Sequence, residues 1–279
     1  RLRCDWSSDV CSSDLFELAL LDLIGRINKK SAESIVGLKE LDGNFGYTAV
    51  LGILSQQQFS SQVQRYSKIG FTDFKIKLSG KFQLDNDNIR HLNTTITNSR
   101  IRLDANNLWT NWRSAADYIK RLGFDFLGVE EPLAHGDFEG MQKFSNSINT
   151  PIILDESFLR FEHFKHIKSS PKNWLINLRI SKMGGILRSI EIANQAENLG
   201  LSLIIGTQVG ETSILTRAAL SIANHYRDLV IAQEGAFGTY LLEKDITEDP
   251  IIFGKDGVLE SSSITTNSYG WGMNIRTLE

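Results

Sequence analysis

Three acidic side chains follow short apolar runs in the middle of the chain. Asp104 closes the run IRLD, Glu130 follows FLGV and Asp155 follows IIL. A single acid at a strand end is more often a loop cap or an ion-pair partner than a ligand. Three acids on consecutive runs favour a metal site instead, and an all-oxygen carboxylate site favours Mg²⁺, or Mn²⁺, over zinc or copper.

Two lysines, Lys75 and Lys77, flank Ile76 in the run FKIKL. With a strand period of two, both lysines share one face and Ile76 takes the other. If this strand were a solvent-exposed edge, the two lysines would need no functional explanation. In a covered sheet, however, crowding and desolvation are what allow a lysine to act as a general base near neutral pH.

Elements that position these residues recur along the chain. Helix-like segments that end at Gly70, Gly123 and Gly200 alternate with the apolar runs, and each glycine suits a left-handed helix C-cap. The apolar runs, separated by 24 to 28 residues, are TAVLGIL (48–54), FKIKL (74–78), IRLD (101–104), FLGVEE (126–131), IILDES (152–157), WLINLRI (174–180), SLIIGT (202–207) and LVIAQE (229–234).

Eight apolar strands alternating with amphipathic helices predict an α/β fold, a (β/α)8-type TIM barrel. An open doubly wound sheet is the alternative, but no GxGxxG motif follows the first strand. Active sites of such barrels lie at the C-terminal ends of the strands, where these acids and lysines are expected.

The composition excludes several classes of protein. The chain has 279 residues, 41% of them hydrophobic and 23% charged, as in a soluble globular protein of one large or two small domains. No apolar run is long enough to span a membrane. A net charge of -3 argues against nucleic acid and favours a small-molecule partner. Both cysteines, Cys4 and Cys11, precede the body of the chain, which excludes a disulfide framework there and fits a cytoplasmic protein.

Residues 1–14 show neither apolar periodicity nor a signal-peptide pattern, so we expect no regular structure there. The run DWSSDVCSSDL is similar to the translation of a common DNA sequencing adapter, which predicts a non-native segment; a disordered Ser/Asp-rich tail is the alternative. After it we expect a helical segment within 15–46, the barrel over 47–240 and a C-terminal segment over 241–279.

The order Lys-x-Lys, DAN, EEP, DES and KMGG resembles the enolase superfamily, and within it the mandelate racemase and muconate-lactonizing group, over roughly residues 15–260. The resemblance implies that three acids hold Mg²⁺, which binds a substrate carboxylate and stabilises an enediolate after a lysine removes the α-proton. It also implies that 15–46 is the end of a capping domain, that 241–279 returns toward that cap, and that a chain lacking the rest is poorly active.

Carried over by motif, Asp104, Glu130 and Asp155 become the metal ligands. Lys77 becomes the base, and Lys75 lies beside it to contact the substrate carboxylate. Candidates for contacts with the ligands or the substrate are Asn106, Glu156, Lys182 and Glu211. For Glu211, a helix N-terminal acid favoured by the helix dipole is an equally good interpretation.

One residue departs from the family pattern. Arg179 stands in INLRISKMGG where relatives carry a lysine, and arginine stays protonated and cannot act as a base. It could clamp a carboxylate, stabilise developing negative charge, or form only a structural ion pair. Lys182 lies three residues further on, an odd offset that predicts the opposite strand face and argues against it as a replacement base.

These residues lead to a Mg²⁺-dependent lyase or isomerase as the main hypothesis. It abstracts the proton α to a carboxylate from one face, and β-elimination or cycloisomerisation follows. The second hypothesis is an epimerase of dipeptides or N-acyl amino acids that uses another base. The third is a non-catalytic member of the superfamily that only binds a ligand. A homo-oligomer is also compatible with the sequence.

Overall fold

The computed structural model describes residues 8–264 and 269–276 of the chain. Its main sheet has eight parallel strands in chain order. All eight runs expected from the sequence are strands, with bounds β2 (Ala49–Leu51), β3 (Asp73–Lys77), β4 (Arg100–Asp104), β5 (Gly128–Glu130), β6 (Ile152–Leu154), β7 (Trp174–Leu178), β8 (Ser202–Ile205) and β9 (Val230–Gln233).

The first and last strands of this sheet, β2 and β9, meet and close it. The N–H of Thr48, just before β2, donates to the carbonyl of Gln233, the last residue of β9, at 2.8 Å. The predicted (β/α)8 barrel is therefore confirmed, and the open doubly wound alternative is wrong. The register places Lys77 opposite Asp104, and Asp104 opposite Glu130. Charged residues from neighbouring strands thus lie at one level of the barrel.

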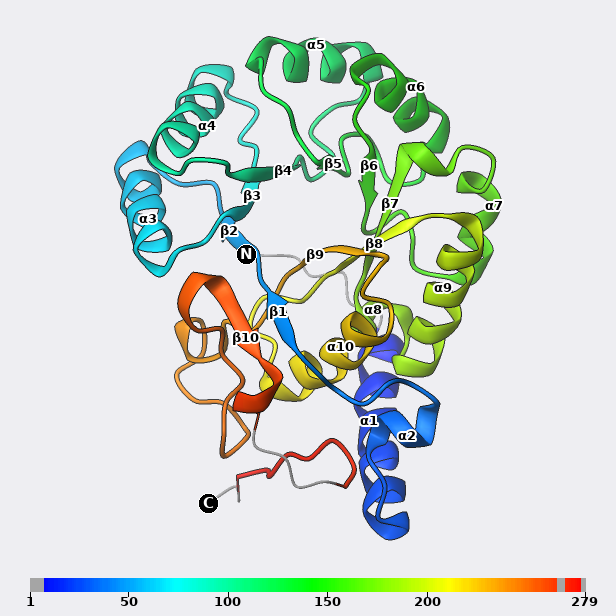
Figure 1. Cartoon of the computed structure of the whole chain (residues 1–279). Helices are drawn as coiled ribbons and strands as arrows, with labels where there is room; N and C mark the ends of the chain where they lie inside the picture. Colours follow the sequence, from blue (N-terminus) through cyan, green and yellow to red (C-terminus); the bar gives the residue numbers. More distant parts are fainter. Residues whose placement is uncertain (1–7, 265–268, 277–279) are drawn as a thin grey trace.

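Helices surround the strands on the outside (Figure 1). Gly70, Gly123 and Gly200 cap three of them in the left-handed conformation, as the sequence predicts. The helices after the strands are α3 (Gln56–Ile69), α4 (Phe82–Thr95), α5 (Trp112–Leu122), α6 (Phe138–Ile148), α7 (Phe164–Ile167), α8 (Ile180–Met183), α9 (Ile186–Leu199) and α10 (Ser213–His225). Short 3-10 turns are η1 (Phe161–His163), η2 (Pro171–Asn173), η3 (Gly238–Tyr240), η4 (Lys255–Gly257) and η5 (Ser261–Ser263).

Two apolar clusters support the barrel. The larger one fills the space between strands and helices and includes Ile152 and Leu154. The smaller one consists of Ile153, Leu175, Ile204 and Ala232, residues that alternate with the first set along their strands. Since successive strand residues point to opposite faces, the smaller cluster lies inside the barrel, with the charged residues further along the same strands.

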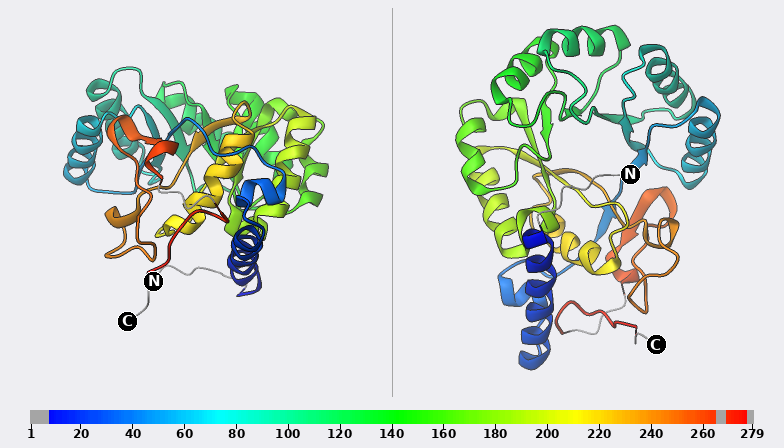
Figure 2. Two further views of the ribbon diagram at one scale, coloured as in Figure 1. Left: turned by 60° about the horizontal axis from the view of Figure 1, so that its bottom comes forward. Right: turned by 180° about the vertical axis from the view of Figure 1, so that it is seen from behind.

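The N- and C-terminal segments pack against each other beside the barrel. Helix α1 (Ser8–Asn28) begins inside the segment that was expected to lack regular structure, so that expectation is wrong for residues 8–14. Helix α2 (Ala32–Val36) follows, and β1 (Asn44–Gly46) pairs antiparallel with β10 (Val258–Glu260). The indole of Trp271 donates to the Leu18 carbonyl at 2.9 Å. Figure 2 shows α1 beside the barrel and extending past it.

None of the helices in the described part of the chain has the length and apolar character needed to cross a lipid bilayer.

Candidate active site

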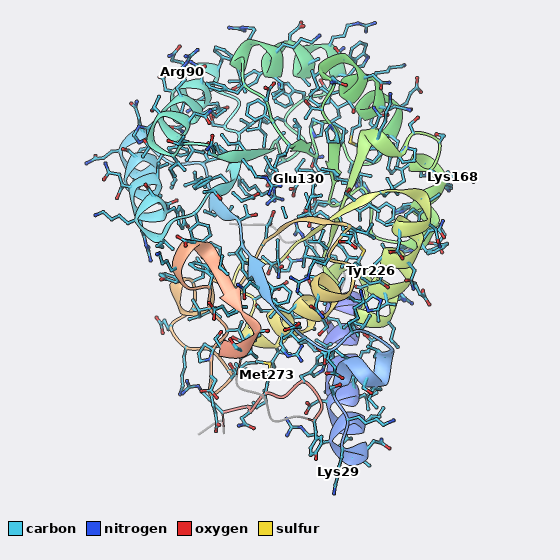
Figure 3. The ribbon with its side chains drawn as sticks, viewed as in Figure 1. Lys29, Arg90, Glu130, Lys168, Tyr226 and Met273 are labelled. Atoms are coloured by element: carbon cyan, nitrogen blue, oxygen red, sulfur yellow. The ribbon has the colours of Figure 1, made fainter. Side chains whose placement is uncertain are left out.

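Three acids form a row at the C-terminal ends of neighbouring strands. Asp104 and Glu130 end β4 and β5, and Asp155 follows β6. Their side chains are only 3%, 2% and 4% exposed. Glu130 is labelled inside the ring of strands in Figure 3. The barrel therefore holds three carboxylates out of water, which is costly unless cations compensate them.

Lys75 lies between two of these acids. Its ammonium is 2.8 Å from Glu130 Oε1 and Oε2 and 3.3 Å from Asp104 Oδ2. Burial alone would lower the pKa of Lys75, but the surrounding carboxylates of Glu130, Glu234 and Asp104 raise it. These carboxylates therefore favour the charged form of Lys75.

Lys77 shares this face, as the strand alternation predicts, but lies nearer the solvent. Its side chain is 38% exposed, and its ammonium is 3.7 Å from Asp104 Oδ2. The ammonium also donates to Asn106 Oδ1 at 3.2 Å, and the Asn106 N–H donates to Asp104 Oδ1 at 3.2 Å. Asn106 has a positive φ of 43°. Lys77 thus lies at the Asp104 end of the acid row, on its solvent-exposed side.

Arg179 lies at the other end of the row. Its guanidinium donates to Asp155 Oδ2 and is 3.7 Å from Glu130 Oε1. The guanidinium and its two partners are nearly buried, at 11%, 4% and 2% exposure. The Asn177 amide, also buried, donates to Glu130 Oε1 at 3.3 Å.

Lys182 belongs to this end as well, so its predicted position on the opposite face is wrong. Strand β7 ends at Leu178 and the chain turns into α8, which removes the period of two on which the prediction depended. The Lys182 ammonium lies 3.2 Å from Asp155 Oδ1 and 2.8 Å from Glu156 Oε1. Lys77 and Lys182 therefore flank the three acids from opposite ends.

Burial shifts the titration of the acids. It raises the pKa of Glu130 to about 7, although the Lys75 ammonium opposes the shift. It also raises the pKa of Asp155, against the opposing charges of Arg179 and Lys182. For Glu156, burial is outweighed by hydrogen bonding to Asp155 and Lys182, and the pKa falls to about 2.

Glu211 is not brought into the row. Its carboxylate accepts from the Gln208 N–H at 2.7 Å within the loop after β8. Burial raises its pKa. Within the described residues it makes no ion pair with Lys75, Lys182 or Arg179, so its role as a substrate contact stays a prediction.

Sequence reasoning missed two charged residues of the barrel interior. Glu234 lies 3.5 Å from the Lys75 ammonium and 3.1 Å from the guanidinium of Arg102, whose side chain is fully buried. Glu234 ends the run LVIAQE just as the other acids end theirs, and Arg102 shares a strand face with Asp104. The rules that found the first three acids could therefore have found both residues.

The donor types in the row suit a hard divalent ion, because all three candidate ligands are carboxylates. Glu130 Oε2 is buried, and its partner in the described residues is the Lys75 ammonium, 2.8 Å away. In the described residues, the acids do not converge on one point at coordinating distance. Lys75 bridges the first and second acids, and Arg179 bridges the second and third.

A family model described as enolase C-terminal domain-like matches residues 58–277. The chain belongs to this family. This match confirms the resemblance to the enolase superfamily that the ordered motifs predicted.

Sequence relatives of this enolase-like chain include an N-succinyl-L-Arg/Lys racemase of Bacillus cereus, 23% identical over 82% of this chain. A hydrophobic dipeptide epimerase of Enterococcus faecalis is 26% identical over 80% of it. The chain spans 62% and 63% of the lengths of these two relatives. A solved dipeptide epimerase of Cytophaga hutchinsonii, complexed with Mg and the dipeptide D-Ala-L-Val, has a TM-score of 0.84 at 21% identity, covering 98% of this chain and 72% of the other.

Proposed function

We propose that this protein is an isomerase that removes the proton α to the carboxylate of a dipeptide or N-acyl amino acid and returns it with inversion. The observation that carries the proposal is the row of three acids with a lysine at each end, Lys77 from β3 and Lys182 from the segment after β7. The names of the relatives support the substrate class, because dipeptides and N-succinyl amino acids are both N-acylated amino acids.

Asp104, Glu130 and Asp155 would hold the metal ion, with Mg²⁺ preferred and Mn²⁺ accepted. Mg is present in the solved dipeptide epimerase complexes that this chain resembles in fold. When bound, the ion supplies positive charge for the substrate carboxylate. Glu130 Oε2, which faces the Lys75 ammonium at 2.8 Å, is one of the oxygens that would hold it.

Lys77 is the proposed base, because its side chain is 38% exposed at the barrel mouth whereas that of Lys75 is 4% exposed. Its neutral amine takes the α-proton, the C–H electron pair moves into the carboxylate to form an enediolate, and Lys77 becomes an ammonium. Lys182, at the far end of the row, is the ammonium that donates a proton to the opposite face. Lys75 and Arg179 stay charged and stabilise negative charge on the substrate.

The main hypothesis from the sequence, elimination or cycloisomerisation from one face, is the second candidate. Arg179 favours it, because a guanidinium in the position where relatives carry a lysine cannot exchange protons. The names of the relatives favour the epimerase instead.

Exchange in D2O tests the proposal. The protein, with MgCl2 and a panel of L,L-dipeptides, is expected to exchange the α-hydrogen and to produce the epimer, both followed by NMR. Lys77→Met is expected to lower exchange about 10²–10⁴-fold, the usual contribution of a general base. Lys182→Met is expected to abolish inversion and to retain some exchange. Lys120→Met, on exposed α5, is the matched control.

The outcomes separate the candidates. Exchange with retention in the wild type would support one-face chemistry. Absence of exchange with every dipeptide, in a folded protein that binds Mg²⁺, would contradict the dipeptide epimerase. Absence of exchange with N-succinyl amino acids as well would favour a ligand-binding member of the family.

We further propose a cytoplasmic location and a homo-oligomeric state. In this proposal the segment 15–46, whose Leu18 carbonyl accepts a hydrogen bond from the Trp271 indole, is the end of a capping domain to which 241–279 returns, and residues 1–14 are not native.

A further inference from the structure

The second glutamate of the EEP motif, Glu131, is completely buried next to the acid row. It follows Glu130 directly and has a positive φ of 38°, a conformation that non-glycine residues adopt at a cost. Strained residues persist only where the surrounding structure fixes them, and they cluster at functional sites. The contacts of the Glu131 side chain should therefore explain why this backbone conformation is retained.

Both carboxylate oxygens of Glu131 are occupied by the loop that follows β6. Oε1 accepts from the backbone N–H groups of Asp155 and Ser157, each at 2.8 Å. Oε2 accepts from the Ser157 hydroxyl at 2.7 Å. In the part of the chain that the structure describes, no lysine or arginine pairs with this carboxylate, so the loop is its principal partner.

The backbone of Glu131, at the end of β5, joins this strand to its two neighbours, β4 and β6. Its carbonyl accepts from the Asn107 N–H at 2.7 Å, in the loop after β4, and its own N–H donates to Ile153 on β6 at 3.1 Å. One residue therefore joins the ends of β4, β5 and β6. These are the strands that present Asp104, Glu130 and Asp155.

We infer that Glu131 is a positioning residue that fixes the backbone of Asp155 and so aims the Asp155 carboxylate at the site shared with Asp104 and Glu130. The inference rests on the proposed function, because it takes Asp155 as a metal ligand. A charged acceptor strengthens hydrogen bonds to backbone N–H groups, and a buried donor without an acceptor is costly. Loss of the carboxylate would therefore release the loop.

Mn²⁺ binding to the full chain, measured by calorimetry and electron paramagnetic resonance, tests the inference. Glu131→Ala is expected to weaken Mn²⁺ affinity about 10–100-fold, the usual effect of losing a group that orients a ligand. Glu131→Gln keeps one acceptor oxygen for both backbone donors and is expected to stay within roughly threefold. Ser157→Ala, which removes one contact, is the milder variant if Glu131→Ala does not fold. Glu139→Ala, exposed on α6, is the matched control.

Amide hydrogen exchange of residues 155–157 is a readout that does not need the metal. It is expected to accelerate at least about tenfold in Glu131→Ala and to stay unchanged in Glu131→Gln. Unchanged exchange, or unchanged Mn²⁺ affinity in a folded Glu131→Ala protein, overturns the inference. If the wild-type protein binds no Mn²⁺, the proposed metal site fails, and the exchange data alone decide whether Glu131 positions the loop.

Discussion

Replacement of Arg179 by methionine tests how nearby cations compensate the negative charge of the three buried acids. Removing one partner of an isolated buried ion pair costs about 3–5 kcal/mol. Here Lys182 still contacts Asp155 and Lys75 still contacts Glu130, so the loss is closer to one charged hydrogen bond, about 2 kcal/mol. At roughly 2 °C per kcal/mol for a chain of this size, the melting temperature should fall by about 4 °C in EDTA.

Magnesium should reverse this loss. With Arg179 gone, a divalent ion meets less positive charge at Glu130 and Asp155, and a ligand at 100 times its Kd stabilises the folded state by about 2.7 kcal/mol. Thermal melts followed by circular dichroism in EDTA and in increasing MgCl2 measure both effects. Arg113→Met, on the exposed surface of α5, is the control. A variant that melts with the wild type in EDTA, or whose melting temperature Mg²⁺ raises no more than that of the wild type, would refute this role of Arg179.

Two further predictions concern stability. Burial alone would raise the pKa of Glu33, but the charge of Arg217 and hydrogen bonds from Arg217 and Ser221 hold it below its ordinary value of 4.5. Glu33→Gln should therefore lower the free energy of unfolding by about 3 kcal/mol at pH 7. The stability supplied by a carboxyl with a lowered pKa is lost as the pH falls below its ordinary value of 4.5. Urea unfolding at several pH values should therefore show a smaller difference between variant and wild type below pH 4.5. Gly206→Ala places a methyl group 2.9 Å from Arg179 Cγ and closer still to Asn177 Oδ1, so it should cost about 1–3 kcal/mol. In the same assay Gly52→Ala, which meets nothing within 4 Å, should cost less than 1 kcal/mol; equal effects of the two alanines would contradict the described packing.

The barrel could be predicted from the sequence because its strands are short apolar runs at a nearly constant spacing. The same regularity put Asp104, Glu130 and Lys77 at one level, and the register confirms that placement. What lies beyond a strand end could not be predicted in this way. Lys182 was assigned to the wrong face because the chain leaves the strand after Leu178, and a local turn is not visible in an apolar pattern.

Contacts between residues far apart in the chain could not be predicted from the sequence either. Arg102 and Glu234 are 132 residues apart, and only closure of the barrel brings them together. The role of Glu131 is similar, because its partners lie in a loop that begins 24 residues later. The types of these residues were visible in the sequence, but their contacts depend on the order and register of the strands.

Asp104, Glu130 and Asp155 are proposed to hold one divalent ion. A crystal structure of this chain grown with Mn²⁺, with anomalous difference density at the manganese edge, tests it most directly. We predict a single strong peak about 2.0–2.4 Å from an oxygen of each of the three acids, a range typical of hard divalent cations. A peak at another position, or none at saturating Mn²⁺ with Lys75 and Arg179 still bridging the acids, would contradict the account.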